Sequence, residues 1–373
     1  MKFIHKTLCL VTLVYLLQGC QAQIDPTKIE AAVENRAQLF LQDARISSVS
    51  INIYADGKFF SNHFGELDKG KGNTPTDSTL YEIASVTKTM TGYLVAKAIH
   101  DKKIALDDPV TKFLGPAYKN LSFQGNPITI QHLLTHTSGL PLNMEGIDEL
   151  QAQGTKEACE KAQKILTNYT KESFLKALQN VTIQQAPGVQ YSYSNVAPNI
   201  LAYILEMVYQ KPFEILIKEE LFTPLGMEAT AINLSDAQQL LLTNGYNDNG
   251  ERMPSYKQPI QLWGAAGRVK SNSQDLLKYI QFQLQKENSI VQATHSKLFR
   301  DLENVWIGYF WEIIEDENGT RLEHHGGLYG MQNWMIVYPE YNVGISILTN
   351  ASFPETSQLL KATATDIFND ILN

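Results

Sequence analysis

A serine and a lysine stand three residues apart in the segment YEIASVTKTMTG, residues 81–92, which runs on into a helix-like stretch. Residues at i and i+3 share one face of a helix, so the amine of Lys88 can lie beside the hydroxyl of Ser85. A serine hydroxyl becomes nucleophilic only when a neighbouring base takes its proton, and a helix N-terminus offers N–H groups that stabilise negative charge. The pair therefore predicts a nucleophile at Ser85.

The spacing alone is a weak signal. It occurs again at Ser173 and Lys176 in the charged segment TKESFLKALQN, where a solvated helix face explains it. A catalytic interpretation of Ser85 therefore needs further groups elsewhere in the chain.

One further group is the pair Tyr193 and Asn195, in the Pro- and Gly-flanked loop PGVQYSYSN that precedes a helix-like segment. Both side chains can point into a cleft, where a neighbouring ammonium group would lower the Tyr193 pKa from about 10 and make the phenol a base. Tyr118 and Asn120 have the same spacing, but a turn-rich stretch follows them, and we interpret them as structural.

A third group is LEHHGGLYG, which ends a strand-like segment. Glycines in a strand let a ligand approach the backbone, so the N–H of Gly327 could face the N–H of Ser85 across a developing oxyanion. The alternative is an ordinary turn after a hairpin, with the histidines on the surface.

Together these segments resemble the serine β-lactamase and penicillin-binding enzyme family. The resemblance is to the branch with a tyrosine in the second motif: class C β-lactamases, D-Ala–D-Ala carboxypeptidases, D-aminopeptidases and related esterases. It covers roughly residues 30–370, because ALDDPV, ITIQHLLTHTSGLP and GAAGRVKSNSQDLLKY follow in the family's order. It implies a serine hydrolase without metal or cofactor that cleaves an amide or ester through an acyl-serine intermediate, with weak β-lactamase activity. The alternative is a non-catalytic penicillin-binding or cell-envelope protein.

The resemblance also implies roles for the motif residues. Ser85 would form the acyl-enzyme, Lys88 would lower the proton affinity of that serine, and Tyr193 would shuttle protons to the leaving group. Asn195 would hold Lys88 and the substrate amide.

Alignment through Gly330 places His324, His325 and Gly326 on the family's Lys-Thr-Gly motif, with Gly327 supplying the oxyanion N–H. A histidine is mostly neutral at pH 7, unlike the lysine that it replaces. We therefore expect poor β-lactam turnover, better activity on neutral esters or peptides, and binding of carboxylate substrates that strengthens as the pH falls through the titration of His324.

The elements that must position these residues suggest an α+β fold. The segment 49–65 alternates on both sides of ADGK and predicts a hairpin, and strand patterns return near the C-terminus, with a turn at Asn318-Gly319 and another near Tyr341-Asn342. Helical patterns occupy the middle, and helices also flank the strands at both ends of the chain.

This order predicts one catalytic domain, residues 24–373, with the β-lactamase/DD-peptidase-like fold that the resemblance implies. An antiparallel sheet lobe would combine 29–84 with 258–373, and a helical lobe, 85–257, would be inserted between them. The site is expected in the cleft between the lobes, where residues 142–172 would form a roof whose sequence is too polar and irregular to interpret.

The first twenty residues, MKFIHKTLCLVTLVYLLQGC, predict a signal peptide. Lys2 and Lys6 precede the apolar run Leu8–Leu17, which is too short to span a bilayer. The end of this run resembles a bacterial lipoprotein cleavage site, so residues 1–19 would be removed and Cys20 would carry lipid; cleavage after Ala22 is the alternative. We expect an exported, periplasm-facing or cell-surface protein with a lipid anchor.

Composition excludes some partners. The 373 residues carry 31 Lys and Arg against 39 Asp and Glu, for a net charge of −8, and no basic block is present to bind nucleic acid. With Cys9 removed and Cys20 lipidated, Cys159 has no cysteine left to pair with. The expected partner is a small molecule or peptide, such as one derived from peptidoglycan.

Three other patterns do not support a different site. GELDKGKG resembles a phosphate loop, but Gly72 stands where a magnesium-binding Ser or Thr belongs. His132 and His136 could bind zinc, but no acidic third ligand is evident, and helix-end packing is the preferred interpretation. No G-x-S-x-G occurs, so an α/β-hydrolase would lack its nucleophile.

Overall fold

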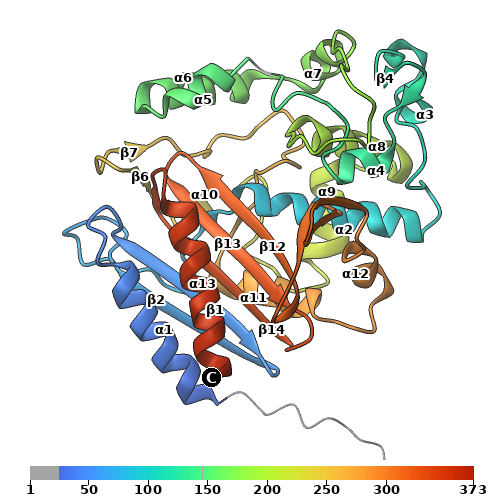
Figure 1. Ribbon diagram of the computed structural model, residues 1–373. Helices are drawn as coiled ribbons and strands as arrows, with labels where there is room; N and C mark the ends of the chain where they lie inside the picture. The colour runs from blue at the N-terminus through green and yellow to red at the C-terminus, as the bar shows by residue number, and fades with distance from the viewer. Residues whose placement is uncertain (1–24, 145) are drawn as a thin grey trace, which may run out of the picture.

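The computed structural model describes residues 25–144 and 146–373 (Figure 1). Its centre is an eight-stranded antiparallel sheet in the order β2-β1-β14-β13-β12-β11-β10-β9. The strands are β1 Ser48–Ala55, β2 Lys58–Gly65, β9 Phe299–Leu302, β10 Val305–Gly308, β11 Trp311–Asp316, β12 Gly319–Leu328, β13 Met331–Tyr338 and β14 Val343–Thr349. Because β1 pairs with β14, the two ends of the chain build one sheet, which confirms the predicted α+β class.

The predicted hairpin turns are present. Asp56 and Gly57 connect β1 to β2 with φ of 48° and 82°, the left-handed values that a tight two-residue turn requires. Gly319, with φ of 89°, begins β12 after the turn from β11, and Asn342, with φ of 54°, precedes β14.

Helices α1 (Pro26–Phe40) and α13 (Thr356–Leu372) lie side by side over one face of the sheet (Figure 1). The side chain of Asp25 caps α1 by accepting from the N–H of Thr27. Arg36 joins the two helices through ion pairs with Asp366 and Asp370. The first and last helices of the described chain are thereby held together on one face of the sheet.

The opposite face is covered by α11 (Ser273–Gln283), which packs on β1 and β14. Next to it, α2 (Thr87–His100) packs against α8 (Val196–Tyr209) and α12 (Ser289–Thr294). Nearly every residue of α2 is buried, including the threonines of its first turns. Tertiary packing therefore holds a helix whose first turns have low intrinsic helix propensity.

Most of the remaining elements lie above the sheet and are largely helical (Figure 1). The polar segment that we expected to form a roof contains two helices, α5 and α6. The elements of this region are α3 Thr111–Leu114, β4 Ser122–Phe123, β5 Asn126–Pro127, α4 Ile130–Leu134, α5 Asp148–Gln153, α6 Lys156–Asn168, α7 Lys171–Leu178, α9 Phe213–Ile217, α10 Asp236–Gln239, β6 Gly245–Asn247 and β7 Arg252–Met253.

None of the helices within 25–144 and 146–373 is long and apolar enough to cross a membrane. The predicted signal peptide, residues 1–19, and Cys20 lie outside the described residues, so their assignments stay predictions.

Candidate active site

Ser85 lies in a short 3-10 helix, Ala84–Val86, that leads directly into α2. Ala84 has φ of 46°, a left-handed value that costs energy for a residue with a Cβ and is sustained only by its surroundings. The N–H of Ile83 donates to the Val269 carbonyl at 3.1 Å, and the Asn333 side chain donates to the Ile83 carbonyl at 3.2 Å. The serine is thus presented by a strained turn that is anchored on both sides.

Two glycines let neighbouring segments close on this turn. A Cβ on Gly326 of β12 would lie 2.3 Å from the Ile83 carbonyl oxygen, so only glycine allows the observed approach. A Cβ on Gly267 would lie 3.3 Å from the carbonyl carbon of Ala84. The predicted site residue Gly326 therefore acts by letting the strand approach, and it does not line the cavity described below.

Lys88 is completely buried and makes three polar contacts. Its Nζ lies 3.0 Å from Ser85 Oγ, 2.8 Å from Asn195 Oδ1 and 2.5 Å from the Ala266 carbonyl oxygen. Burial, with the nearby Arg268 cation, lowers the Lys88 pKa well below its ordinary value. A neutral amine has two N–H donors and one lone pair. Asn195 and Ala266 take the two donors, which leaves the lone pair for the proton of Ser85.

Tyr193 contacts the same hydroxyl from a second direction. Its O–H donates to Ser85 Oγ at 2.6 Å, and its ring packs on His136 with 4.5 Å between ring centres. Burial raises the Tyr193 pKa above its ordinary value, so the expectation of a lowered pKa is wrong. The physical reason is that burial strips a phenolate of its hydration, which outweighs the hydrogen bond with Ser85, and the charge of Glu312 raises the pKa further.

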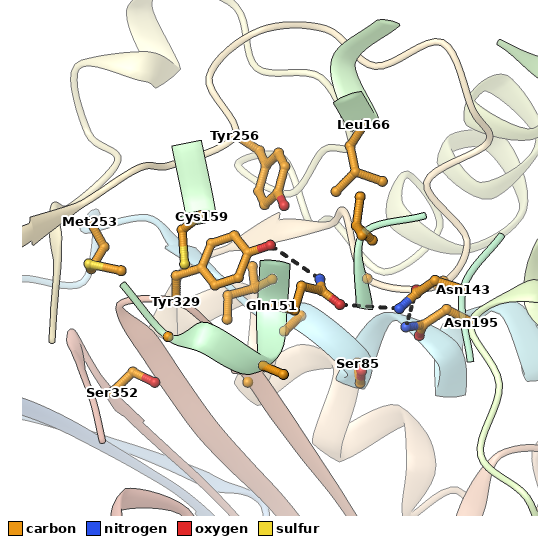
Figure 2. Close-up of a pocket in the computed structure, with 18 of the residues that line it drawn as sticks. Ser85, Asn143, Gln151, Cys159, Leu166, Asn195, Met253, Tyr256, Tyr329 and Ser352 are labelled. Atoms are coloured by element: carbon orange, nitrogen blue, oxygen red, sulfur yellow. Dashed lines mark hydrogen bonds between the residues drawn. The ribbon is translucent and has the colours of Figure 1, made fainter. Parts of the chain in front are cut away.

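Asn195 begins a chain of side-chain hydrogen bonds that sequence analysis missed. Its Nδ2 donates to Asn143 Oδ1 at 2.9 Å, and Asn143 Nδ2 donates to Gln151 Oε1 at 3.1 Å. Gln151 Nε2 in turn donates to Tyr329 Oη at 3.2 Å, as Figure 2 shows. The chain connects the partner of Lys88 with the turn after β12 through α5. Asn143 and Gln151 stand in the segment that could not be interpreted, so no motif pointed to them.

His324 is buried on one face of β12, near enough to Lys88 for the two basic groups to disfavour each other's protonation. His325 points to the other face, beside Trp334 and 3.0 Å from Gln332 Oε1. The two consecutive histidines therefore lie on opposite faces of β12, as strand geometry requires.

The predicted titration of His324 is wrong. Burial lowers its pKa to about 3, its Nδ1–H donates to the His325 carbonyl at 2.7 Å, and it does not line the cavity beside Ser85. A neutral ring in this position carries no charge for a carboxylate at any pH near neutrality.

The cavity beside Ser85 measures about 840 Å³, a size suited to a small substrate. Gly327, Tyr193 and Asn195 border it next to the serine, and Figure 2 shows Tyr256, Tyr329 and Leu166 over its outer part. The roof comes from 147–166, as the position of this segment in the chain predicted. Other lining residues contributed by the roof and by the loops opposite include Ile147, Gln153, Thr155, Cys159, Met253, Ile260, Leu262 and Phe353.

The sequence patterns that we interpreted as structural have structural roles in the fold. The Ser173 hydroxyl is exposed and bonds with Thr170, and Asn120 Nδ2 donates to the Leu178 and Val181 carbonyls. His132 caps the start of α4 by accepting from the N–H of Thr129, which confirms the interpretation as helix-end packing. No group of three His, Cys, Asp or Glu that could hold a metal exists in the described part of the chain.

One group of residues outside the motifs also combines a serine, a histidine and an aspartate, the residue types of a catalytic triad. Ser50 Oγ lies 2.9 Å from His63 Nδ1, and His63 Nε2 lies 2.9 Å from Asp77 Oδ1. Ser50 is fully buried and does not line the cavity beside Ser85, so a substrate has no route to it there. We interpret this group as a structural network between β1 and β2.

The geometry agrees with comparisons to known proteins. A family model described as Beta-lactamase matches residues 29–369. Protein flp of Staphylococcus aureus (strain COL) is 27% identical over 88% of this chain, which spans 64% of that relative's length. A protein named Beta-lactamase from Pseudomonas fluorescens is 24% identical over 91% of this chain and 98% of its own.

A crystal structure titled Beta-lactamase/D-alanine Carboxypeptidase from Yersinia pestis complexed with citrate has the same fold. It matches with a TM-score of 0.78 and 21% identity over 93% of this chain and 99% of that one. The family match, the shared fold and the Ser85, Lys88 and Tyr193 cluster agree with one another. The chain belongs to the beta-lactamase family of serine hydrolases.

Proposed function

We propose that this protein hydrolyses an amide or ester bond through an acyl-enzyme formed on Ser85. The observation that carries the proposal is the position of Ser85 Oγ, 3.0 Å from the Lys88 amine and 2.6 Å from the Tyr193 hydroxyl. A proton acceptor and a proton donor thus meet at one hydroxyl, which is what acyl transfer to a serine requires.

In the first step, the neutral Lys88 amine takes the proton of Ser85 while Oγ forms a bond to the substrate carbonyl carbon. The backbone N–H groups of Ser85 and Gly327 would stabilise the resulting oxyanion. Tyr193 then donates its proton to the departing amine or alkoxide and is reprotonated from the Lys88 ammonium. The carbon–leaving-group bond breaks, and the acyl-enzyme remains.

In the second step, water attacks the acyl carbon and loses its proton to the same pair of groups. The bond between the carbonyl carbon and Ser85 Oγ breaks, and Oγ recovers a proton. The acid product and the starting enzyme are released, so no external reactant besides water is consumed.

The decisive experiment is covalent labelling of the purified protein by a fluorophosphonate, followed by intact mass. The wild type should gain one adduct, and Ser85→Ala should gain none. Ser173→Ala is the matched control, because Ser173 has the same lysine spacing on an exposed helix face. An adduct on Ser85→Ala equal to that on the wild type would refute the nucleophile assignment.

The substrate class we propose is a peptide related to D-Ala–D-Ala or a small ester. Support comes from the relatives, whose names include a β-lactamase and a D-alanine carboxypeptidase. Release of D-alanine from a muramyl pentapeptide should be compared with release of p-nitrophenol from its acetate. Activity on the ester alone would remove the peptidase assignment. Stable acylation by a penicillin with no product over hours would favour a penicillin-binding role instead.

We propose further that Cys20 is lipidated and holds the enzyme at a membrane facing the periplasm. The support is the apolar run Leu8–Leu17 followed by Gln18, Gly19 and Cys20. In membrane fractions of expressing cells, the wild type should be retained and Cys20→Ser released. A wild type that fractionates with the soluble proteins would refute the anchor.

A further inference from the structure

Arg268 stands out among the residues that line the cavity beside Ser85. It is the one lysine or arginine among the described lining residues. No ion pair to its guanidinium lies within 4 Å in the described chain, and Nη1 is buried without a hydrogen-bond partner. A buried donor of this kind is costly unless a ligand or water satisfies it.

The ring of Tyr256 holds the guanidinium in place. The Arg268 Cζ lies 3.2 Å from the ring centre, a stacking contact that uses the flat face of the group. Tyr256 itself is buried, and its N–H donates to Glu82 Oε1 at 2.9 Å. Because stacking occupies only the face, the edge formed by Nε and Nη2, which are neither buried nor hydrogen-bonded within the described residues, stays available for the paired hydrogen bonds that a carboxylate accepts.

Arg268 is also close to the reacting groups along the backbone. Two residues before it, the Ala266 carbonyl accepts from Lys88 Nζ, and one residue before it, Gly267 lies against Ala84. Two peptide units span at most about 7 to 8 Å, so a substituent a few bonds from the scissile carbonyl can reach the arginine.

No carboxylate among the described residues around the cavity forms an ion pair with this cation. Asp248 and Glu251 line the cavity but make no ion pair with it, and Glu82, which feels its charge, lies beyond ion-pair distance. His324, at the position where the family resemblance implies a lysine, is neutral and lies outside the lining.

We propose that Arg268 determines specificity by binding a carboxylate of the substrate. The preferred substrates are then amides or esters that carry a carboxylate a few bonds from the scissile carbonyl. This inference rests on the proposed function and adds the chemistry of the substrate to it.

The test compares two p-nitrophenyl esters with four-carbon acyl chains, the hemisuccinate, which has a terminal carboxylate, and the butyrate, which has none. The readout is the ratio of kcat/KM for hemisuccinate to kcat/KM for butyrate. A ratio cancels any general effect of the arginine charge on Lys88. Arg268→Gln should lower it roughly 10- to 150-fold, the range for a hydrogen bond to a charged group.

Two further variants sharpen the result. Arg268→Lys should give an intermediate ratio, because a lysine keeps the charge but lacks the planar pair of donors. Arg300→Gln is the matched control, since Arg300 also stacks on an aromatic ring, Trp306, and does not line the cavity. It should leave the ratio unchanged. An unchanged ratio in Arg268→Gln would overturn the proposal.

A binding measurement tests carboxylate recognition by Arg268 without relying on catalytic turnover. Monomethyl succinate should bind to Ser85→Ala in calorimetric titration, and the additional change Arg268→Gln should weaken that binding at least about tenfold. Equal binding by the two proteins would also overturn the proposal. Normal fluorophosphonate labelling of Ser85 with no carboxylate preference would refute this inference alone, whereas absent labelling would refute the proposed function.

Discussion

The Lys88 amine lies 3.0 Å from the Ser85 hydroxyl, and its two other polar contacts are both acceptors, Asn195 Oδ1 and the Ala266 carbonyl. In a fully buried position, an ammonium ion would need compensating charge, and no carboxylate forms an ion pair with Lys88 in the described chain. The neutral amine instead satisfies every contact. This geometry supports the proposal that Lys88 is the base, so that protonation of its amine would stop the reaction.

Replacing Lys88 by arginine should therefore abolish acylation, although the positive charge is kept. Arginine stays protonated at every accessible pH and cannot take the serine proton. The fluorophosphonate labelling rate and the hydrolysis of p-nitrophenyl acetate should both fall at least about 100-fold. Lys176→Arg, at the exposed pair with the same spacing, should behave as the wild type. Labelling of Lys88→Arg at the wild-type rate would show that another group takes the proton.

The charge of Arg268 should set the pH at which the enzyme becomes active. Its cation helps to lower the Lys88 pKa, because two like charges disfavour each other. Without it, Lys88 holds its proton to higher pH, so Arg268→Gln should shift the ascending limb of kcat/KM for p-nitrophenyl acetate to higher pH. A shift to lower pH would contradict this electrostatic account.

Tyr193→Phe separates the hydroxyl of Tyr193 from its ring. The phenylalanine ring can keep its packing on His136, but the donor to Ser85 Oγ is lost. Turnover of p-nitrophenyl acetate should fall roughly 100- to 10,000-fold, the usual range for a general acid–base group. The free energy of unfolding, measured in urea, should change by no more than about 1.5 kcal/mol. A variant that keeps wild-type turnover would exclude Tyr193 as the proton shuttle.

Gly326→Ala should lower the stability of the fold and slow the acylation of Ser85. The new Cβ would lie 2.3 Å from the Ile83 carbonyl oxygen and 2.5 Å from Asn333 Nδ2, so the turn before Ser85 must move. We expect a loss of about 1 to 3 kcal/mol in the free energy of unfolding, with slower labelling of Ser85. Gly267→Ala, whose Cβ would meet backbone only at 3.3 Å, should cost less. An equal cost at the two positions would show that β12 does not fix the turn.

The sequence predicted the elements whose signals are local. Alternation on both sides of Asp56-Gly57 identified the first hairpin. Two short motifs identified Ser85, Lys88, Tyr193 and Asn195, which the structure brings together through hydrogen bonds. Spacing on a helix or loop decides which side chains face the same way, so such groups can be recognised without coordinates.

Properties that depend on burial could not be predicted in the same way. The motif gave Tyr193 a lowered pKa and His324 an ordinary one, and both were wrong because desolvation outweighs the other effects at these buried sites. Arg268 lies in GAAGRVKSNSQDLLKY, a segment to which no site residue was assigned. Its importance appears only when Tyr256 is seen stacked on it and no described carboxylate forms an ion pair with it. These pKa values and the surroundings of Arg268 depend on residues that are distant in the sequence and meet only in the fold.

Acid should destabilise the fold through its buried histidines, and His324 provides the clearest test. Burial lowers its pKa to about 3, below the value of about 6.5 expected in the unfolded chain. Between these two values the unfolded state binds more protons than the folded state. The stabilisation is therefore complete above pH 6.5 and is lost as the pH falls toward 3, by at most about 1.4 kcal/mol per pH unit.

Urea unfolding between pH 6.5 and 5.0 measures this slope in a window above the titration of most carboxylates. His324→Gln should flatten the slope relative to the wild type, because glutamine takes up no proton. His100→Gln, at an exposed histidine of α2, should leave it unchanged. His295, whose pKa burial lowers to about 4, contributes in the same direction, so some slope remains in His324→Gln. If the slopes of His324→Gln and the wild type coincide, His324 takes up protons equally in the folded and unfolded protein. Its pKa is then not lowered by burial, and His324 as well as Arg268 could carry a charge for a substrate carboxylate below pH 6.5.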